Sequence, residues 1–230
     1  MKSTVHRAVL AWIGLAGMCC SDPPKKATAA PRSPAERPLK PAETPRQARR
    51  RLFPKLNPGA AGAETPGLLS FAPATGLTVQ PVLRKPGNTV TPSGEQITSI
   101  LELGKPLGWI YRDNLMGLMP KAVVKLIGQG GGGVRFLILD TELPGIESLV
   151  LLPVFWDQAR EALGRVPWLA LPDRTTCRFL PAGPWRMVVE MSKDFAKRHK
   201  EASEPLAEGF LIRDGDRLIA GARFDSLLRE

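Results

Sequence analysis

The chain has 230 residues, 43% of them hydrophobic, and a formal net charge of +10. This length predicts one domain, with or without a tail. The charge is unevenly spread, because residues 21–58 hold ten Lys or Arg against three Asp or Glu, whereas residues 59–230 hold twenty against nineteen. Since the predicted globular part is nearly neutral, a basic surface built for specific nucleic-acid binding is not expected.

The cysteines and histidines argue against several kinds of site. Cys19, Cys20 and Cys177 leave one cysteine in the predicted domain, too few for a disulfide framework. His199 is the domain's single histidine, and no zinc-ligand spacing occurs. We therefore expect no metal and no cofactor, and we assign no catalytic or cofactor-binding residue.

Residues 1–20 resemble a signal or anchor segment. Two basic residues precede an apolar run of eleven residues, 8–18, which fits a signal-peptide core and is too short to span a bilayer. Cys19 follows Leu-Ala-Gly-Met, a sequence similar to the cleavage box of bacterial lipoproteins, and is therefore a candidate for lipidation. The basic residues after the run oppose translocation, so an unexported segment of a cytoplasmic protein is the alternative.

Residues 21–67 are predicted to form a disordered, basic, proline-rich linker. Nine prolines and ten basic residues between positions 21 and 58 leave little apolar surface to bury. Such a composition favours an extended, semi-stiff chain. The run Arg49–Arg51 is interpreted as part of a solvated tether, with contact to acidic lipid or nucleic acid as the alternatives.

An α+β domain is predicted over residues 68–230. A strand is expected over 77–83, at a sheet edge because Pro81 lacks an N–H group. Ser93 and Gln96 match a capping box and predict the start of a helix. A strand at 109–111 is then expected.

A helix over 114–127, interrupted by Pro120, is predicted next. The glycine run 128–133 formally matches the dinucleotide motif G-x-G-x-x-G, which needs a strand before it and a helix after it. Here a predicted helix precedes the run and a strand over 134–139 follows it. The run is therefore interpreted as a flexible loop.

The stretch 147–179 is the densest apolar region of the chain. It predicts a strand over 148–152, a helix that begins at Pro153 and ends at Gly164, and a strand over 166–171. A turn at Pro172-Asp173 and a strand over 175–180 follow. Phe155 and Trp156 are expected to anchor the helix against the sheet.

A family resemblance rests on the same region. Leu151-Leu152-Pro153, Trp156, Leu163-Gly164 and the run 170–174 resemble the signature of the bacterial YtpQ-like family, mainly within residues 140–180. Pro-Asp-Arg departs from the Pro-x-Arg-Asp turn of that family. The resemblance implies a fold related to a domain of unknown function, and it implies no catalytic residue.

The last third of the chain predicts a helix and a hairpin. Apolar residues recur at three- and four-residue steps over 185–199, which is typical of an amphipathic helix with His199 near the edge of the core. Two apolar runs, 210–212 and 218–220, flank Asp214-Gly215 and predict a β-hairpin.

Two pairs of residues could carry chemistry. Cys177 and His199 are the one possible nucleophile and base, although Cys177 is expected to face the core, where thiols are inert. Asp173 and Arg174 form a possible polar site at the end of a strand, with a solvated turn as the alternative.

These observations favour a non-catalytic binding or scaffold domain, tethered to a membrane or envelope by its N-terminal segment. The alternative is a cytosolic adaptor whose basic arm binds acidic partners, and a Cys/His hydrolase comes third. No specific partner is predicted beyond a membrane surface.

Overall fold

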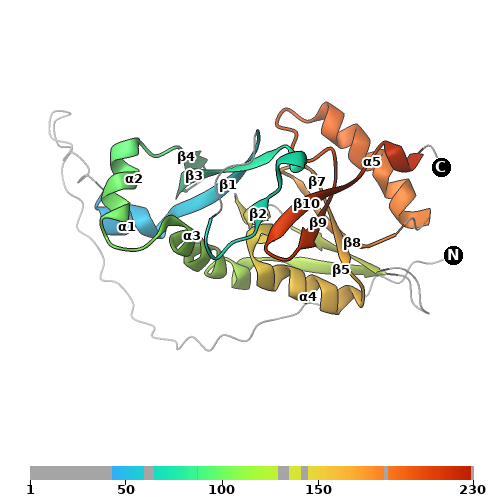
Figure 1. Ribbon diagram of the computed structural model, residues 1–230, viewed down its shortest axis with the longest axis horizontal. Helices are drawn as coiled ribbons and strands as arrows, with labels where there is room; N and C mark the ends of the chain where they lie inside the picture. Colours follow the sequence, from blue (N-terminus) through green and yellow to red (C-terminus); the bar gives the residue numbers. More distant parts are fainter. Residues whose placement is uncertain are drawn as a thin grey trace, which may run out of the picture.

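The computed structural model describes residues 43–59, 65–86, 88–128, 135–140, 145–183 and 186–228. Within them the fold is α+β, as predicted, with helices packed against two separate β-sheets (Figure 1). The α-helices are α1 (Pro45–Arg50), α2 (Gly94–Leu101), α3 (Leu107–Met116), α4 (Pro153–Leu163) and α5 (Arg186–Glu201). The short 3-10 helices are η1 (Pro73–Thr75), η2 (Met119–Lys121), η3 (Ile146–Leu151) and η4 (Ser226–Leu228).

The smaller sheet has three strands in the order β1-β3-β4, all antiparallel. Its strands are β1 (Leu52–Pro58), β3 (Leu77–Lys85) and β4 (Asn88–Val90). Because β4 pairs only with the last residues of β3, from Leu83 onward, Pro81 has a neighbouring strand on one side alone. This local edge agrees with the prediction for a strand that contains proline.

The larger sheet has seven strands in the order β2-β10-β9-β7-β8-β6-β5. Its strands are β2 (Ser70–Phe71), β5 (Val124–Gly128), β6 (Arg135–Leu139), β7 (Pro167–Asp173), β8 (Thr176–Pro181), β9 (Gly209–Asp214) and β10 (Arg217–Arg223). The β2–β10 pair is parallel, and the other pairs are antiparallel. The predicted hairpin around Asp214-Gly215 is confirmed as β9–β10.

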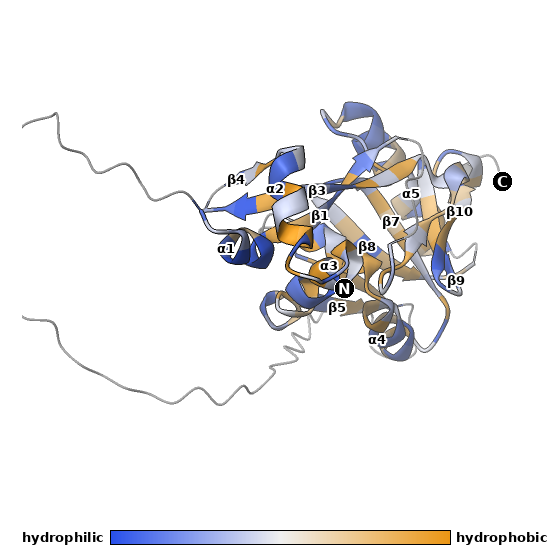
Figure 2. Cartoon of the chain, turned by 60° about the vertical axis from the view of Figure 1, so that its left-hand side comes forward, coloured by the Kyte–Doolittle hydropathy of each residue, from blue (hydrophilic) through white to orange (hydrophobic). Residues whose placement is uncertain are grey.

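The seven-stranded sheet is buried on both faces. Successive strand residues point to opposite faces, so Leu169 belongs to the core cluster that contains Trp156 of α4, whereas Ala170 belongs to the cluster that contains Phe195 of α5. Helices α4 and α5 accordingly lie on opposite sides of the sheet (Figure 1). Figure 2 shows strands β7 and β8 as largely hydrophobic, in contrast to α1.

The predicted helix after Pro153 is confirmed as α4. Proline occupies its first turn, where no N–H group is needed, and Gly164 ends it with a φ of 67°. Trp156 is fully buried, donates from Nε1 to the carbonyl oxygen of Val150 at 2.7 Å, and meets the Phe179 ring edge-on. Trp156 and Phe155 thus anchor α4 to the sheet, as expected.

The strand predicted over 148–152 is wrong, because this segment is the 3-10 helix η3. All of its residues are buried, and it packs between β1 and α4. Ser148 Oγ donates to the carbonyl oxygen of Pro54 at 2.6 Å, and Leu69 N donates to the carbonyl oxygen of Leu151 at 2.8 Å. A short apolar run surrounded by core fits a strand and a helix equally well.

Two further predictions between residues 109 and 127 are wrong. Residues 109–111 belong to helix α3, whose buried Ile110, Tyr111 and Leu115 follow helical spacing. The helix predicted over 114–127 stops at Met116, and strand β5 follows the short turn that contains Pro120.

The strand predicted over 134–139 is confirmed as β6. The glycine run is flanked by β5 and β6, and its residues 129–133 lie outside the described residues.

The folded part begins earlier than predicted, which corrects the linker boundary at residue 67. Helix α1 has a capping box at Thr44, and Leu52 and Leu56 of β1 are fully buried. Apolar residues at alternate positions of β1 outweigh the proline and basic content that suggested a linker. The predicted linker up to residue 42 and the segment 1–20 with Cys19 lie outside the described residues.

The turn predicted at Pro172-Asp173 lies one residue further on, because β7 extends through Asp173. The pairing of β7 with β8 shifts register between Ala170 and Asp173, which accommodates a proline that cannot donate to the neighbouring strand.

Among the described helices, none is long and apolar enough to cross a membrane.

Candidate functional site

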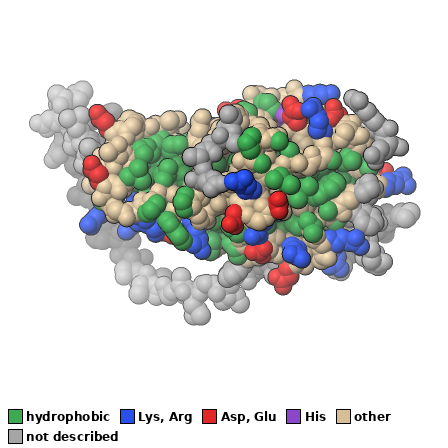
Figure 3. All heavy atoms as spheres, in the orientation of Figure 1, with side chains coloured by type: hydrophobic (Ala, Val, Ile, Leu, Met, Phe, Trp, Pro, Cys, Tyr) green, Lys and Arg blue, Asp and Glu red, His purple; other side chains and the backbone are tan. Residues whose placement is uncertain are grey.

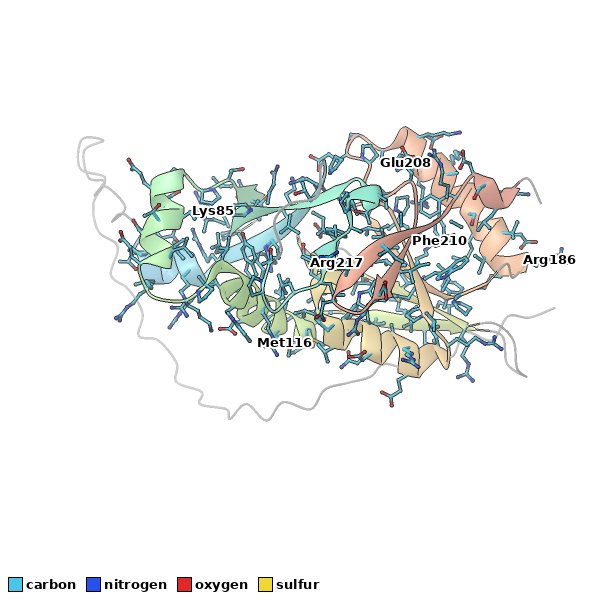
Figure 4. All side chains as sticks on the ribbon, viewed as in Figure 1. Lys85, Met116, Arg186, Glu208, Phe210 and Arg217 are labelled. Carbon is cyan, nitrogen blue, oxygen red and sulfur yellow. The ribbon has the colours of Figure 1, made fainter. Side chains whose placement is uncertain are left out.

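An open groove of about 900 Å³ lies beside α3. Four segments that are far apart in the sequence line it: residues 65–70, the C-terminal half of α3, the start of α4 and the β9–β10 turn. Figure 4 labels Met116 of α3 and Arg217 of β10, which both belong to its lining.

Helix α3 supplies an exposed, partly apolar wall. Trp109 is 40% exposed and Met116 is 42% exposed, and with Arg112 they follow one face of the helix at three- and four-residue steps. The Arg112 guanidinium lies 4.9 Å from the centre of the Trp109 ring, a cation–π arrangement. Arg112 and Met116 line the groove, whereas Trp109 lies one turn before Arg112, outside the lining.

The groove is fixed in place by close packing between α3 and the segment before β2. A Cβ atom on Gly108 would lie 2.2 Å from the carbonyl oxygen of Pro66, so only glycine permits this approach. At Gly67 a Cβ atom would lie 3.8 Å from the Trp109 ring, which is an ordinary contact, so that approach does not require glycine. The wall and the neighbouring backbone thus form a preassembled unit.

The opposite wall is the first turn of α4. Val154 is 37% exposed and lines the groove with Asp157. Arg213 of β9 donates from Nη1 to Asp157 Oδ1 at 2.7 Å and to the carbonyl oxygen of Pro153 at 3.1 Å. These bonds tie the seven-stranded sheet to the start of α4.

The β9–β10 turn brings carboxylates to the groove. Gly215 adopts a φ of 57°, and the Asp216 carbonyl oxygen accepts a hydrogen bond from Ser70 N at 3.0 Å. Asp214 and Asp216 are exposed, and neither carboxylate forms an ion pair with another described residue. Acidic side chains border hydrophobic ones near the centre of the face in Figure 3.

The possible polar site at Asp173 and Arg174 lies elsewhere, at the β7–β8 turn. Asp173 is buried, and its Oδ1 accepts from Thr175 N and from Thr175 Oγ1, both at 2.7 Å. Thr176 Oγ1 donates to Asp173 Oδ2 at 3.3 Å. These bonds close the turn in the way an aspartate commonly does.

Arg174 connects three other segments. Its Nη2 donates to Asn57 Oδ1 at 2.6 Å, its Nη1 lies 3.4 Å from Glu147 Oε1, and its Nε donates to Glu204. Burial raises the pKa of the Glu147 carboxyl, and the Arg174 guanidinium opposes that shift only in part. All of these polar groups have partners, which is typical of an ion-pair network that stabilises a fold.

The structure does not bring Cys177 and His199 together. Cys177 is buried in the core cluster on the α4 side of the sheet, whereas α5, which carries His199, packs on the other side. Burial also raises the pKa of the Cys177 thiol, which disfavours the thiolate needed for nucleophilic attack.

Among the described residues, no group of three or more His, Cys, Asp or Glu is arranged to hold a metal ion.

The groove was not predicted from the sequence. Asp214-Gly215 was recognised only as a turn, and α3 was divided between a strand and a helix. The spacing of Trp109, Arg112 and Met116 was the available signal, since three- and four-residue steps would have placed them on one helical face.

Comparison of the chain with protein-family models, with curated proteins and with solved structures gave no match. The YtpQ-like resemblance therefore stays a prediction.

Proposed function

We propose that this protein is a non-catalytic binding domain whose groove receives an extended, positively charged peptide segment. The observation that carries the proposal is the position of two carboxylates without described ion-pair partners, Asp214 and Asp216, beside the exposed side chains of Met116 and Val154.

The shape and chemistry of the groove support a peptide ligand. An open groove suits a chain that lies along it, and the exposed apolar side chains of Met116 and Val154 offer surface for contact. The carboxylates favour Lys or Arg in the ligand and disfavour acidic side chains, so they supply selectivity more than affinity.

The test is titration of the full chain with two synthetic peptides of the same length, one with lysines spaced by prolines and the other with glutamates at the lysine positions. We expect the lysine peptide to bind and to change Trp fluorescence, and the glutamate peptide to bind at least tenfold more weakly. Equal affinity of the two peptides, or binding of neither, would count against the proposal.

A matched pair of double variants locates the binding. Asp214→Asn with Asp216→Asn should weaken binding of the lysine peptide about three- to tenfold, since exposed ion pairs contribute roughly 0.2–1 kcal/mol each. Glu95→Gln with Glu102→Gln removes the same charge from the exposed surface of α2 and its C-cap, and should leave the affinity unchanged.

The tether belongs to the same proposal. The sequence of residues 1–20 supports attachment to a membrane through a lipid on Cys19. Cys19→Ser should move the protein from the membrane fraction to the soluble fraction, with Cys20→Ser as the control. An intact Met1, found by mass spectrometry together with a wholly soluble protein, would favour the cytosolic adaptor instead.

A further inference from the structure

We infer that Arg112 receives a carboxylate group of the ligand, so that the groove selects a peptide that carries both a basic side chain and a carboxylate. This inference rests on the proposed function and adds a specificity-determining residue on another segment of the groove.

Arg112 is an exposed cation of the groove lining that has no ion-pair partner among the described residues. Two acidic side chains in this part of the molecule are already paired with other cations. Asp113, the next residue of α3, forms an ion pair with Lys105. Asp157 of α4 forms one with Arg213. An anionic group of the ligand can therefore reach Arg112 without displacing a carboxylate of the protein.

The Arg112 side chain is held in one orientation by two contacts. A Cβ atom on Gly67 would lie 3.4 Å from Arg112 Cδ, so the aliphatic part of the side chain packs along the backbone there. The guanidinium lies 4.9 Å from the centre of the Trp109 ring. The close approach of Gly108 to Pro66 keeps the helix and this backbone together. A cation that is ordered before binding loses less conformational entropy when a ligand arrives.

The chemistry of a guanidinium favours a carboxylate as its ligand. It donates two parallel N–H groups to the two oxygens of one carboxylate, which is stronger and more directional than a single hydrogen bond. Met116 lies one helical turn after Arg112 in the same lining. An apolar side chain of the ligand beside the carboxylate would therefore have a surface to contact.

The charges of the lining also favour a ligand of mixed charge. Asp214 and Asp216 lie at the β9–β10 turn, whereas Arg112 lies on α3, so opposite charges come from different segments. Arg217 of β10 is a second cation of the lining (Figure 4). A ligand with basic side chains alone would be attracted by the carboxylates and repelled by Arg112. One carboxylate in the ligand turns that repulsion into attraction.

A carboxylate is either the C-terminal group of a peptide or an Asp or Glu side chain within it, and the experiment separates these sources. The full chain is titrated with three lysine-proline peptides of equal length. The first has a free C-terminal carboxylate, the second an amidated C-terminus, and the third an amidated C-terminus with a single glutamate in place of one proline. We expect the first or the third to bind about three- to tenfold more tightly than the second, the effect of an accessible paired hydrogen bond between ions.

Variants assign the preference to Arg112. Arg112→Gln should remove the preference for the carboxylate and should strengthen binding of the plain amidated peptide, because the repulsion is gone; a misfolded protein would not show that gain. Arg112→Lys keeps the charge but loses the two parallel N–H groups, so it should retain part of the preference. Arg46→Gln removes the same charge from the exposed surface of α1 and should leave all three affinities unchanged.

Two results would overturn the inference and leave the proposed function in place. One is equal binding of all three peptides by the wild type. The other is a preference for the carboxylate that Arg112→Gln leaves unchanged, which would place the carboxylate elsewhere on the protein. Failure of all three peptides to bind the wild type would instead remove the proposed function, and the inference with it.

Discussion

Trp156 joins three parts of the core at the scale of a single side chain. It belongs to α4, its indole N–H bonds the carbonyl oxygen of Val150 in η3, and its ring meets Phe179 of β8 at 5.1 Å. Its replacement therefore affects packing and a buried hydrogen bond at once.

We expect Trp156→Ala to lower the free energy of unfolding by about 3–5 kcal/mol, as measured by denaturant titration. Val166→Ala, at an exposed position, is the control and should change it by less than about 0.5 kcal/mol. A loss below about 1 kcal/mol for Trp156→Ala would mean that the ring is not buried in solution.

Glu147 gives a second prediction, about pH. Burial raises the pKa of the Glu147 carboxyl above its ordinary value of 4.5. At any pH between the ordinary and the raised pKa, the folded protein therefore holds a proton that the unfolded chain has released. The stabilisation from Glu147 is therefore complete below pH 4.5 and is lost as pH rises through the raised pKa. Glu147→Gln cannot titrate, so its stability relative to wild type should increase with pH, by about 1.4 kcal/mol for each pH unit between the two pKa values.

Glu204 provides a control of opposite sign for that measurement. The hydrogen bond from Arg174 lowers the pKa of this exposed carboxyl, so its contribution is present above pH 4.5 and is lost as pH falls. Glu204→Gln should therefore change stability relative to wild type in the acid range, in the direction opposite to Glu147→Gln. The same pH trend in both variants would show that burial does not dominate at Glu147.

At the scale of elements, the end of α4 depends on one backbone conformation. Gly164 has a φ of 67°, where a side chain costs roughly 1–2 kcal/mol. Gly164→Ala should therefore lower the thermal midpoint by several degrees in calorimetry. Gly94→Ala, at the open first turn of α2, should leave it unchanged or raise it slightly. Equal effects of the two substitutions would contradict the assigned cap.

Local signals explain which elements could be predicted. Pro153 with Gly164, Ser93 with Gln96, and Asp214 with Gly215 each specify a start, a cap or a turn through contacts within a few residues, and all three predictions are confirmed. The run 148–152 has no such signal, because its conformation is decided by β1 and α4, which pack around it. The α+β class and the β9–β10 hairpin followed from the local signals, and the pairing of the other strands did not.

At the scale of the whole molecule, the early start of the fold changes where proteases should cut. Trypsin should cleave between residues 21 and 42, where five Lys or Arg occur, and should spare residues 45–58, which form α1 and β1. Mass spectrometry of the resistant fragment should therefore place its N-terminus before Thr44. A stable fragment that begins after Pro58 would contradict the pairing of β1 with β3.

The groove could not be predicted from the sequence, because its lining residues come from four segments that are far apart along the chain. Its walls come from residues 65–70, 112–116, 152–157 and 214–217, and only the folded chain brings these together. The polar pair Asp173 and Arg174 was identified from local turn chemistry, but its partners Glu147 and Asn57 depend on tertiary contacts in the same way.

The parallel pairing of β2 with β10 has a consequence for synthesis of the chain. Ser70 and Phe71 pair with Arg217 and Leu218, so this edge of the sheet is completed by residues that are made long after β2. At about 5–20 residues per second, the ribosome needs many seconds to produce the intervening chain. During that time β2 lacks its partner strand, and Phe71, which is buried in the finished fold, lacks the cover of β10. A nascent chain that stops before Arg217 would have neither the closed sheet edge nor the groove, however completely its earlier helices have formed.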